Sequence, residues 1–328
     1  FAIRGKFTDG HNFLNQAIKK KAIRCIVDRK VSKVSNNKVI NVKNTFFTLK
    51  NLAKITRNYT NSQIIGITGS TGKTTLKNLM GFALKNYGKV YHSPMSYNNK
   101  YGVPLSVCNL KENTEYGIFE IGMDKKGEIN YLSKIVRPEI AVITNISEAH
   151  IKNFNTIKDI AKAKGEIIYN IQKGGSLILN KDDKFFSFFK KKAQERGINV
   201  ISFSSKKNAD IFLSNVIREN NYYKLKVIIK NKTFYFSLKN STDNFINNIL
   251  ACISVISALD LNLNEMKNFF RNFKIPNGRG DICKVKKFNK VFILVDESYN
   301  ANPLSMKSAI KNMDSYKLKN NRKKIIFL

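Results

Sequence analysis

One glycine-rich turn constrains this chain more than any other feature. Apolar residues at 64–67 precede the sequence Thr68-Gly69-Ser70-Thr71-Gly72-Lys73-Thr74-Thr75, and a helical pattern follows over 76–85. A strand, a glycine-rich turn and a helix in this order form a phosphate-binding loop, because backbone N–H groups and the helix N-terminus can surround an anion. Lys73 is expected to neutralise β- and γ-phosphate charge, and the Thr74 hydroxyl to ligate Mg²⁺. A purely structural turn is the alternative, and Gly-Lys-Thr-Thr in this context disfavours it.

Further along the chain, strand and helix patterns alternate. Buried strands are expected over 117–121, 140–144 and 177–179, with helices over 127–135 and 156–171. Such alternation predicts a mostly parallel sheet with helices on both faces.

The remaining segments predict additions to this sheet. Residues 198–238 indicate a small antiparallel part, and two helices follow it. The expected strands are 200–203, 223–229 and 233–238, and the expected helices are 245–259 and 264–273.

The two ends of the chain predict smaller units. We expect a partial α/β domain over 1–60, a central phosphate-loop domain over 61–280 and the start of a Rossmann-like domain over 281–328. Because residues 1–3 and 323–328 both read as strands, the chain is expected to be incomplete at both ends.

Composition excludes some classes of protein. The chain has 58 Lys and Arg against 23 Asp and Glu, a formal net charge of +35, but the basic residues are spread through nearly every segment. We therefore predict no nucleic-acid partner. The four cysteines lie far apart without a CxxC pair, and no apolar run approaches the ~18 residues of a membrane span. These patterns favour a cytoplasmic protein without membrane insertion.

The spacing of the turn points to a family. The common GxxxxGK[ST] form would place a glycine at Ile67, whereas residues 68–75 resemble the TGxxGKTT variant of the Mur ligases and their relative folylpolyglutamate synthetase. Two further segments occur in the matching order. Ser96-Tyr97-Asn98-Asn99 followed by Gly102-Val103-Pro104-Leu105, and Asp296-Glu297-Ser298-Tyr299-Asn300-Ala301-Asn302-Pro303, resemble the Mur ligases that add D-alanyl-D-alanine.

This resemblance implies an activity. Such enzymes are ATP-dependent, ADP-forming ligases of peptidoglycan precursor synthesis, which join UDP-N-acetylmuramoyl-tripeptide to D-alanyl-D-alanine through an acyl phosphate. The implied cofactors are ATP and Mg²⁺, the implied partners are the two substrates, and a monomer is expected. With most of the C-terminal domain absent, the chain could bind nucleotide without turning over.

The resemblance also implies site residues. Glu120 ends a buried strand opposite the loop, where a carboxylate can bind Mg²⁺. Catalytic roles fall on Lys73, Glu120, His150 and Lys164, and metal ligation on Thr74, Glu120, His150 and carbamylated Lys164. Beside residues 68–75, the ATP site would include Asn244, Asn247, Arg279 and Asp296, and the substrates would contact Gly5, Asp9, His11, Ser96, Asn98, Asn99, Tyr299, Asn300 and Asn302.

Several alternatives stay open. Glu120 and His150 could be structural, Lys164 could lie on a solvated face, and Asn244 and Asn247 could serve as ordinary helix-start residues. The sequence leaves open whether Asp296 or Glu297 faces the nucleotide. At the level of function, the alternatives are another Mur ligase or a folylpolyglutamate synthetase, and a basic nucleic-acid-binding ATPase that only the charge favours.

Overall fold

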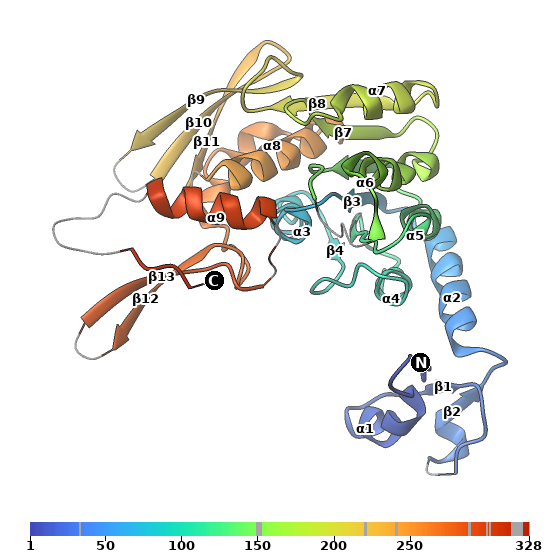
Figure 1. The fold of residues 1–328 in the computed structure, drawn as a ribbon. Coiled ribbons are helices and arrows are strands. Elements are labelled where there is room, and N and C mark those ends of the chain that lie inside the picture. The colour runs from blue at the N-terminus through green and yellow to red at the C-terminus, as the bar shows by residue number, and fades with distance from the viewer. Residues whose placement is uncertain are drawn as a thin grey trace.

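A computed structural model describes residues 1–32, 34–148, 153–219, 222–239, 242–287, 290–299, 301, 303–315 and 324–327 (Figure 1). Its centre is a nine-stranded sheet, counted over these residues, in the order β11-β10-β9-β8-β7-β6-β3-β5-β4. The strands from β4 to β9 in this order pair in parallel, and β10 and β11 continue the sheet in antiparallel fashion. The predicted α/β fold, with a mostly parallel sheet and a small antiparallel part, is confirmed.

The bounds of the sheet strands are β3 Gln63–Thr68, β4 Val90–His92, β5 Tyr116–Glu120, β6 Ile140–Ile143, β7 Ser176–Asn180, β8 Asn199–Ser204, β9 Ile211–Glu219, β10 Tyr222–Ile229 and β11 Lys232–Leu238. The central strands β3, β5 and β6 are buried along nearly their whole length. Strands that are covered on both faces carry continuous apolar runs, which is why these three could be recognised from the sequence.

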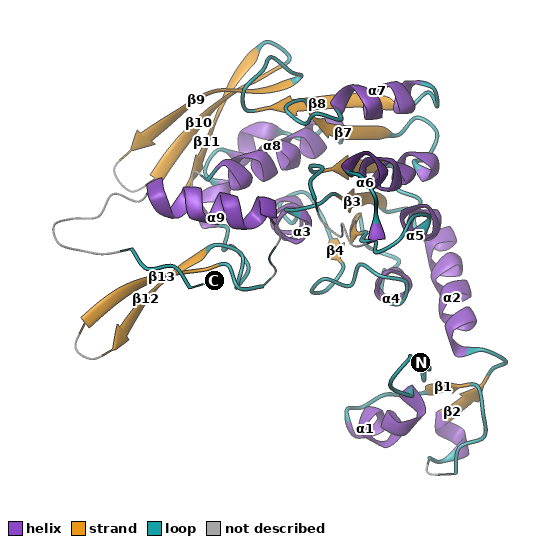
Figure 2. Ribbon diagram, viewed as in Figure 1, coloured by secondary structure: helices purple, strands orange, loops and turns teal. Residues whose placement is uncertain are grey.

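Helices cover both faces of the sheet (Figures 1 and 2). One face packs against α3 (Lys73–Leu84) and α8 (Asp243–Ala258). The other packs against α2 (Thr45–Tyr59), α4 (Gly102–Cys108), α5 (Glu128–Val136), α6 (Ile157–Lys164) and α7 (Phe186–Gln194). Alternate residues of β3 divide between the two cores, with Ile65 and Ile67 on the α3 face and Ile64 on the other.

The N-terminal residues form a small unit of their own. It consists of α1 (Leu14–Lys19) and the parallel pair β1 (Cys25–Val27) and β2 (Val39–Asn41), around a core that includes Leu14 and Val27. Figure 1 shows that α2 leads from this unit to the large sheet.

Near the C-terminus, β12 (Asp281–Lys287) and β13 (Lys290–Asp296) form an antiparallel hairpin that extends away from the sheet (Figure 1). Helix α9 (Pro303–Ser315) lies beside the start of α8. The Lys311 ammonium is 2.9 Å from an Asp243 carboxylate oxygen, and Asn244 donates to the Ser308 hydroxyl at 2.8 Å. These contacts place α9 next to the N-terminus of α8.

Four predictions of local structure were wrong. Residues 1–3 form no strand, because the chain turns back at Gly5 and leaves a single bridge between Arg4 and Asp9. Residues 324–327 likewise form no strand. The strand predicted at 200–203 pairs in parallel with β7, because α7 supplies the crossover that a parallel pair needs.

The fourth error concerns the helix predicted over 264–273. The chain forms two separate 3₁₀ turns there, Leu263–Met266 and Phe269–Asn272. Between them, the Lys267 carbonyl accepts a hydrogen bond from the Ser237 N–H of β11 at 2.8 Å. A carbonyl that accepts a hydrogen bond from a strand in this way does not accept the N–H that a continuous helix would direct to it.

Candidate active site

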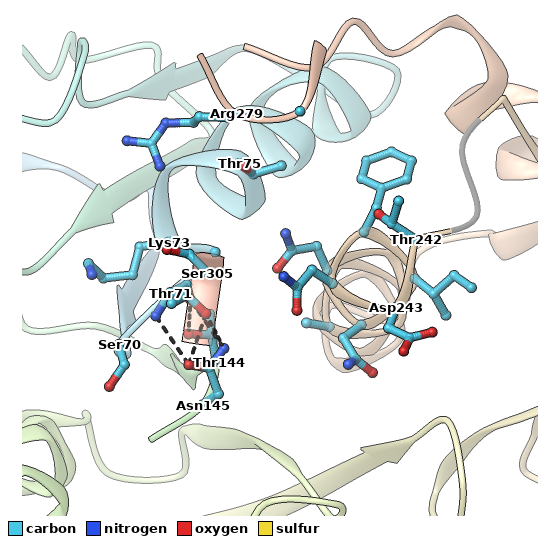
Figure 3. A pocket seen from close by; sticks show the side chains of 18 of the residues that line it. Ser70, Thr71, Lys73, Thr75, Thr144, Asn145, Thr242, Asp243, Arg279 and Ser305 are labelled. Carbon is cyan, nitrogen blue, oxygen red and sulfur yellow. Dashed lines mark hydrogen bonds between the residues drawn. The ribbon is translucent and has the colours of Figure 1, made fainter. Parts of the chain in front are cut away.

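The glycine-rich turn joins β3 to α3 and is held from two sides. Gly69 has φ +143° and Gly72 has φ +81°, a region that favours glycine. At the end of β6, the Thr144 hydroxyl donates to the Thr71 carbonyl at 2.6 Å, and the Asn145 side-chain oxygen accepts from the Thr71 N–H at 3.1 Å (Figure 3). Side chains at the end of β6 therefore help to fix the conformation of the loop.

Two lysine ammonium groups meet at this loop. Lys73 and Lys164 both donate to the Gly69 carbonyl, at 2.8 and 2.9 Å. The Lys164 side chain is almost fully buried, and burial, followed by the nearby charge of Lys73, holds its pKa well below the ordinary value. Burial also lowers the pKa of Lys73, although the Glu120 carboxylate opposes that shift. The solvated-face interpretation of Lys164 is therefore wrong.

Glu120 is the buried acid opposite the loop. One of its oxygens accepts from the Thr74 hydroxyl at 2.7 Å, and the other accepts from the Asn98 amide at 2.8 Å. The ammonium of Lys77 lies 4.0 Å from the same carboxylate. Motif reading missed Lys77, although its position four residues after Lys73 places both side chains on one face of α3.

The Ser96 hydroxyl connects segments that are far apart in the sequence. It lies 3.3 Å from the Thr74 hydroxyl, accepts from Arg279 at 3.4 Å and lies 2.6 Å from the Tyr299 hydroxyl. The Arg279 guanidinium also sits over the Tyr299 ring, 4.0 Å from its centroid. Predicted nucleotide and substrate residues thus meet at one point.

These groups line a pocket of about 810 Å³. The loop forms one wall, the first turns of α8 form the opposite wall, and Arg279 lies near the loop end of the cavity (Figure 3). Of the predicted site residues, those in the lining are Ser70, Thr71, Gly72, Lys73, Thr74, Thr75, Ser96, Asn98, Glu120, Asn244, Asn247, Arg279 and Tyr299. Thr68 and Gly69 belong to the loop outside this lining, and Lys164 contacts the loop through its bond to the Gly69 carbonyl.

Of the two adjacent acids at the end of β13, Asp296 and Glu297, it is Glu297 that lines the pocket. Asp296 instead accepts a hydrogen bond from the Ser298 N–H at 3.0 Å, and hydrogen bonding to Ser298 lowers its pKa. Burial, followed by the charge of Asp296, raises the pKa of Glu297. The sequence left open which of the two acids faces the nucleotide, and the structure favours Glu297.

Comparison with known proteins assigns this site to a family. Residues 67–256 match the family model described as the Mur ligase middle domain. The chain belongs to the Mur ligase family. It is 34% identical over 320 residues to the UDP-N-acetylmuramoyl-tripeptide–D-alanyl-D-alanine ligase of Buchnera aphidicola, which covers 97% of this chain and 68% of that protein.

Solved Mur ligase structures are similar as well. MurF from Acinetobacter baumannii superimposes with a TM-score of 0.84 at 27% identity, covering 96% of this chain and 68% of that one. The MurF ligase of Thermotoga maritima in complex with ADP gives a TM-score of 0.81 at 27% identity, covering 96% of this chain and 71% of that one. The resemblance seen in the loop thus extends over the Mur ligase fold.

Several predicted residues of this Mur ligase lie away from the pocket. Asn99 accepts from the N–H groups of Tyr101 and Gly102 and so shapes the start of α4. In the N-terminal unit, a ring nitrogen of His11 lies 2.6 Å from an Asp9 oxygen, and the Gly5 N–H donates within a turn. His150, Asn300 and Asn302 fall outside the described residues.

Oxygen ligands for a divalent cation are present in this Mur ligase. The Thr74 hydroxyl and the Glu120 carboxylate, 2.7 Å apart at the pocket wall, are the hard donors that Mg²⁺ prefers. Over the described residues, no three His, Cys, Asp or Glu side chains gather to form a metal site. Nor does any helix of the described chain combine the length and apolarity that a bilayer crossing requires.

Burial of Lys164 predicts a pH-dependent stability effect. In CO₂-free buffer, Lys164→Met should raise the free energy of unfolding most at low pH, where the wild-type ammonium is charged and buried. The gain should shrink as the pH rises from the lowered pKa of the folded protein toward 10.5, the ordinary pKa of a lysine. Loss of the hydrogen bond to the Gly69 carbonyl lowers the free energy of unfolding of the variant by about 1 kcal/mol at every pH. Urea unfolding of both proteins across this range measures the difference, and a difference that does not change with pH would contradict the prediction.

Proposed function

We propose that this protein is an ATP-dependent ligase that joins the tripeptide carboxylate of UDP-N-acetylmuramoyl-tripeptide to the amine of D-alanyl-D-alanine. The observation that carries the proposal is the Ser96 contact, which brings the predicted substrate residues Ser96 and Tyr299 to the phosphate loop at Thr74. The Buchnera relative, a UDP-N-acetylmuramoyl-tripeptide–D-alanyl-D-alanine ligase that matches 97% of this chain, supports the same substrates.

The pocket is suited to a nucleoside triphosphate. Backbone N–H groups of the loop and the N-terminus of α3 attract phosphate, and Lys73 supplies a mobile positive charge. The first turns of α8, with Asn244 and Asn247, form the wall across from the phosphates. The related Thermotoga enzyme was solved with ADP, which supports a nucleotide in this family's pocket.

The proposed reaction has two steps. An oxygen of the tripeptide carboxylate attacks the γ-phosphorus of ATP, and the bond from that phosphorus to the β,γ-bridging oxygen breaks, releasing ADP. The amine of D-alanyl-D-alanine then attacks the acyl carbon, phosphate leaves with the former carboxylate oxygen, and the nitrogen loses a proton. The first step moves charge among phosphate oxygens, so positioning and charge stabilisation are what the protein must supply.

Residues of the chain have defined tasks in this scheme. Lys73 offsets charge on the transferring phosphoryl group, and Arg279, which donates to Ser96 near the loop end of the cavity, adds a second positive charge. Thr74 and Glu120 would hold Mg²⁺, and the bound ion would supply positive charge that offsets the charge of the phosphate oxygens. Closure of the pocket would exclude water, which otherwise hydrolyses an acyl phosphate.

Lys164 is proposed to react with CO₂ and form a carbamate. Only a neutral amine attacks CO₂, and the lowered pKa of this buried lysine favours that form. The reaction forms an N–C bond and releases one proton. A carbamate beside Lys73 would replace two like charges with an opposite pair, because both side chains bond the Gly69 carbonyl.

The remaining expectations belong to the same proposal. Residues 1–60 would contribute to uridine-diphosphate binding, residues 61–280 would bind ATP, and residues 281–328 would begin a third domain. We also propose that the protein works as a monomer in the cytoplasm.

Two other functions compete with this proposal. Another Mur ligase or a folylpolyglutamate synthetase would share the ATP site but use a different acceptor. A nucleic-acid-dependent ATPase would be expected to pair acidic residues at the end of β5, where this chain has Glu120 followed by Ile121 and Gly122.

The deciding measurement is ATP-dependent phosphate release by the protein that carries this chain. Release that requires both UDP-N-acetylmuramoyl-tripeptide and D-alanyl-D-alanine supports the proposal. Release with a single amino acid in place of the dipeptide would indicate another ligase, and release stimulated by DNA would overturn the assignment.

A further inference from the structure

Lys77 is a fully buried lysine that the proposed chemistry does not use. It lies on α3 one turn beyond Lys73, and none of its side chain is exposed. Its ammonium donates to the Met95 carbonyl and lies 4.0 Å from the Glu120 carboxylate. A lysine is rarely buried unless its charge has partners, and here one partner is a backbone carbonyl.

The carbonyl that Lys77 binds belongs to the segment 93–98. The start of this segment is fixed to β5, where the Ser93 N–H donates to the Ile118 carbonyl at 3.0 Å. Its end is fixed by Asn98, whose amide donates to Glu120 and whose carbonyl accepts from the Gly122 N–H at 2.8 Å. Lys77 holds the middle of the segment.

The middle of the segment 93–98 needs a stabilising contact, because its backbone conformation is unfavourable. Met95 has φ +44°, in the left-handed region that a side chain disfavours, and its side chain is largely exposed and so anchors little. The next residue is Ser96, whose hydroxyl meets Thr74, Arg279 and Tyr299. A shift of the backbone at Met95 would therefore move the Ser96 hydroxyl and disturb these three contacts.

We infer that Lys77 is a positioning residue, which fixes the segment 93–98 and so places Ser96 and Asn98 for the substrate whose carboxylate is activated. This inference rests on the proposed function for its substrate, but the contacts of Lys77 do not depend on it. The nucleotide is held chiefly by the loop 68–75 and α8; the described contacts join Lys77 directly to neither, and it reaches the loop through the Glu120 carboxylate, which also accepts from Thr74. Lys77 thus governs acceptor binding more than nucleotide binding.

The test compares Lys77→Met with wild type in steady-state kinetics and ADP titration. The KM for UDP-N-acetylmuramoyl-tripeptide should rise roughly ten- to a hundredfold, because small misplacements of positioning groups cost this much. The KM for ATP and the Kd for ADP should stay within about twofold. Lys77→Gln keeps a shorter, uncharged donor, so its KM for UDP-N-acetylmuramoyl-tripeptide should lie between those of wild type and Lys77→Met. It replaces the methionine variant in the test if that variant folds poorly.

Two further readouts separate positioning from general destabilisation. The backbone amides of residue 93 and of residues 95–98 should exchange with deuterium about tenfold faster in the Lys77 variants, a measurement that requires no substrate. Leu79→Val, a core change on the same helix, is the matched control and should leave both that exchange and the acceptor KM unchanged. Combining Lys77→Met with Ser96→Ala should give an effect on KM well below the product of the single effects, because both act through one contact point.

Equal rises in the KM for ATP and for the acceptor, unchanged exchange at 93–98, or the same behaviour in Leu79→Val would each overturn the inference. Wild-type protein that releases no phosphate with both substrates would instead count against the proposed function. The exchange result would still decide the structural role of Lys77.

Discussion

Replacing Lys73 by methionine is expected to lower the kcat of ATP-dependent phosphate release by about 10³-fold or more. The Lys73 ammonium sits at the loop in contact with the Gly69 carbonyl and lines the pocket. It is the cation of the loop that can follow the γ-phosphate as charge shifts. Methionine has similar length but offers the phosphoryl group no charge, so turnover rather than folding should fail.

The control for this change is Lys85→Met, which removes an exposed lysine at the end of the same helix. It should retain nearly full activity, and both variants should unfold at about the wild-type denaturant concentration. A Lys73→Met protein with more than about a tenth of wild-type kcat would mean that other cations carry the phosphoryl charge.

Gly69→Ala is expected to destabilise the loop and weaken ADP binding. An added Cβ would lie 1.9 Å from the Thr144 hydroxyl and 3.0 Å from the Thr144 backbone nitrogen, at a φ of +143°. Overpacking and backbone strain together predict a loss of about 3 kcal/mol in the free energy of unfolding. Urea unfolding and ADP titration measure the two effects.

Gly127→Ala separates strain from collision. Gly127 also has a positive φ, +88°, but an added Cβ would meet nothing within 4 Å. It should cost only about 1 kcal/mol, from the left-handed backbone, and should not change ADP binding. Removing the opposing hydroxyl, in Gly69→Ala with Thr144→Ala, should restore part of the loss. Equal destabilisation by the two glycine substitutions would show that the contact with Thr144 is unimportant.

The elements that could be predicted from the sequence are those whose own residues carry a clear pattern. Strands β3, β5 and β6 are buried apolar runs, and the turn at 68–75 has the glycines that its positive φ values require. Strand β4 was missed because its three residues, Val90–His92, are only half-buried and show no pattern. Helix α4 was missed because its first residues were interpreted as part of a substrate segment.

The candidate site divides in the same way. Residues of the loop could be named from their spacing, whereas the roles of Glu297 and Lys77 depend on tertiary contacts. Two adjacent acids cannot be told apart by sequence when only one faces the cavity. A lysine in a lysine-rich chain is expected in solvent, and nothing local reveals that Lys77 is enclosed.

The contact between Ser96 and Tyr299 spans 203 residues of the chain. The loop, α3 and β5 lie within a much shorter stretch, so they can assemble early, whereas closing a loop of this length is entropically costly and comes late in folding. The phosphate-binding loop should therefore form before the segment that carries Tyr299 packs against Ser96. A ligand that contacts both the loop and that segment would stabilise their association, so its concentration would set how often the segment detaches.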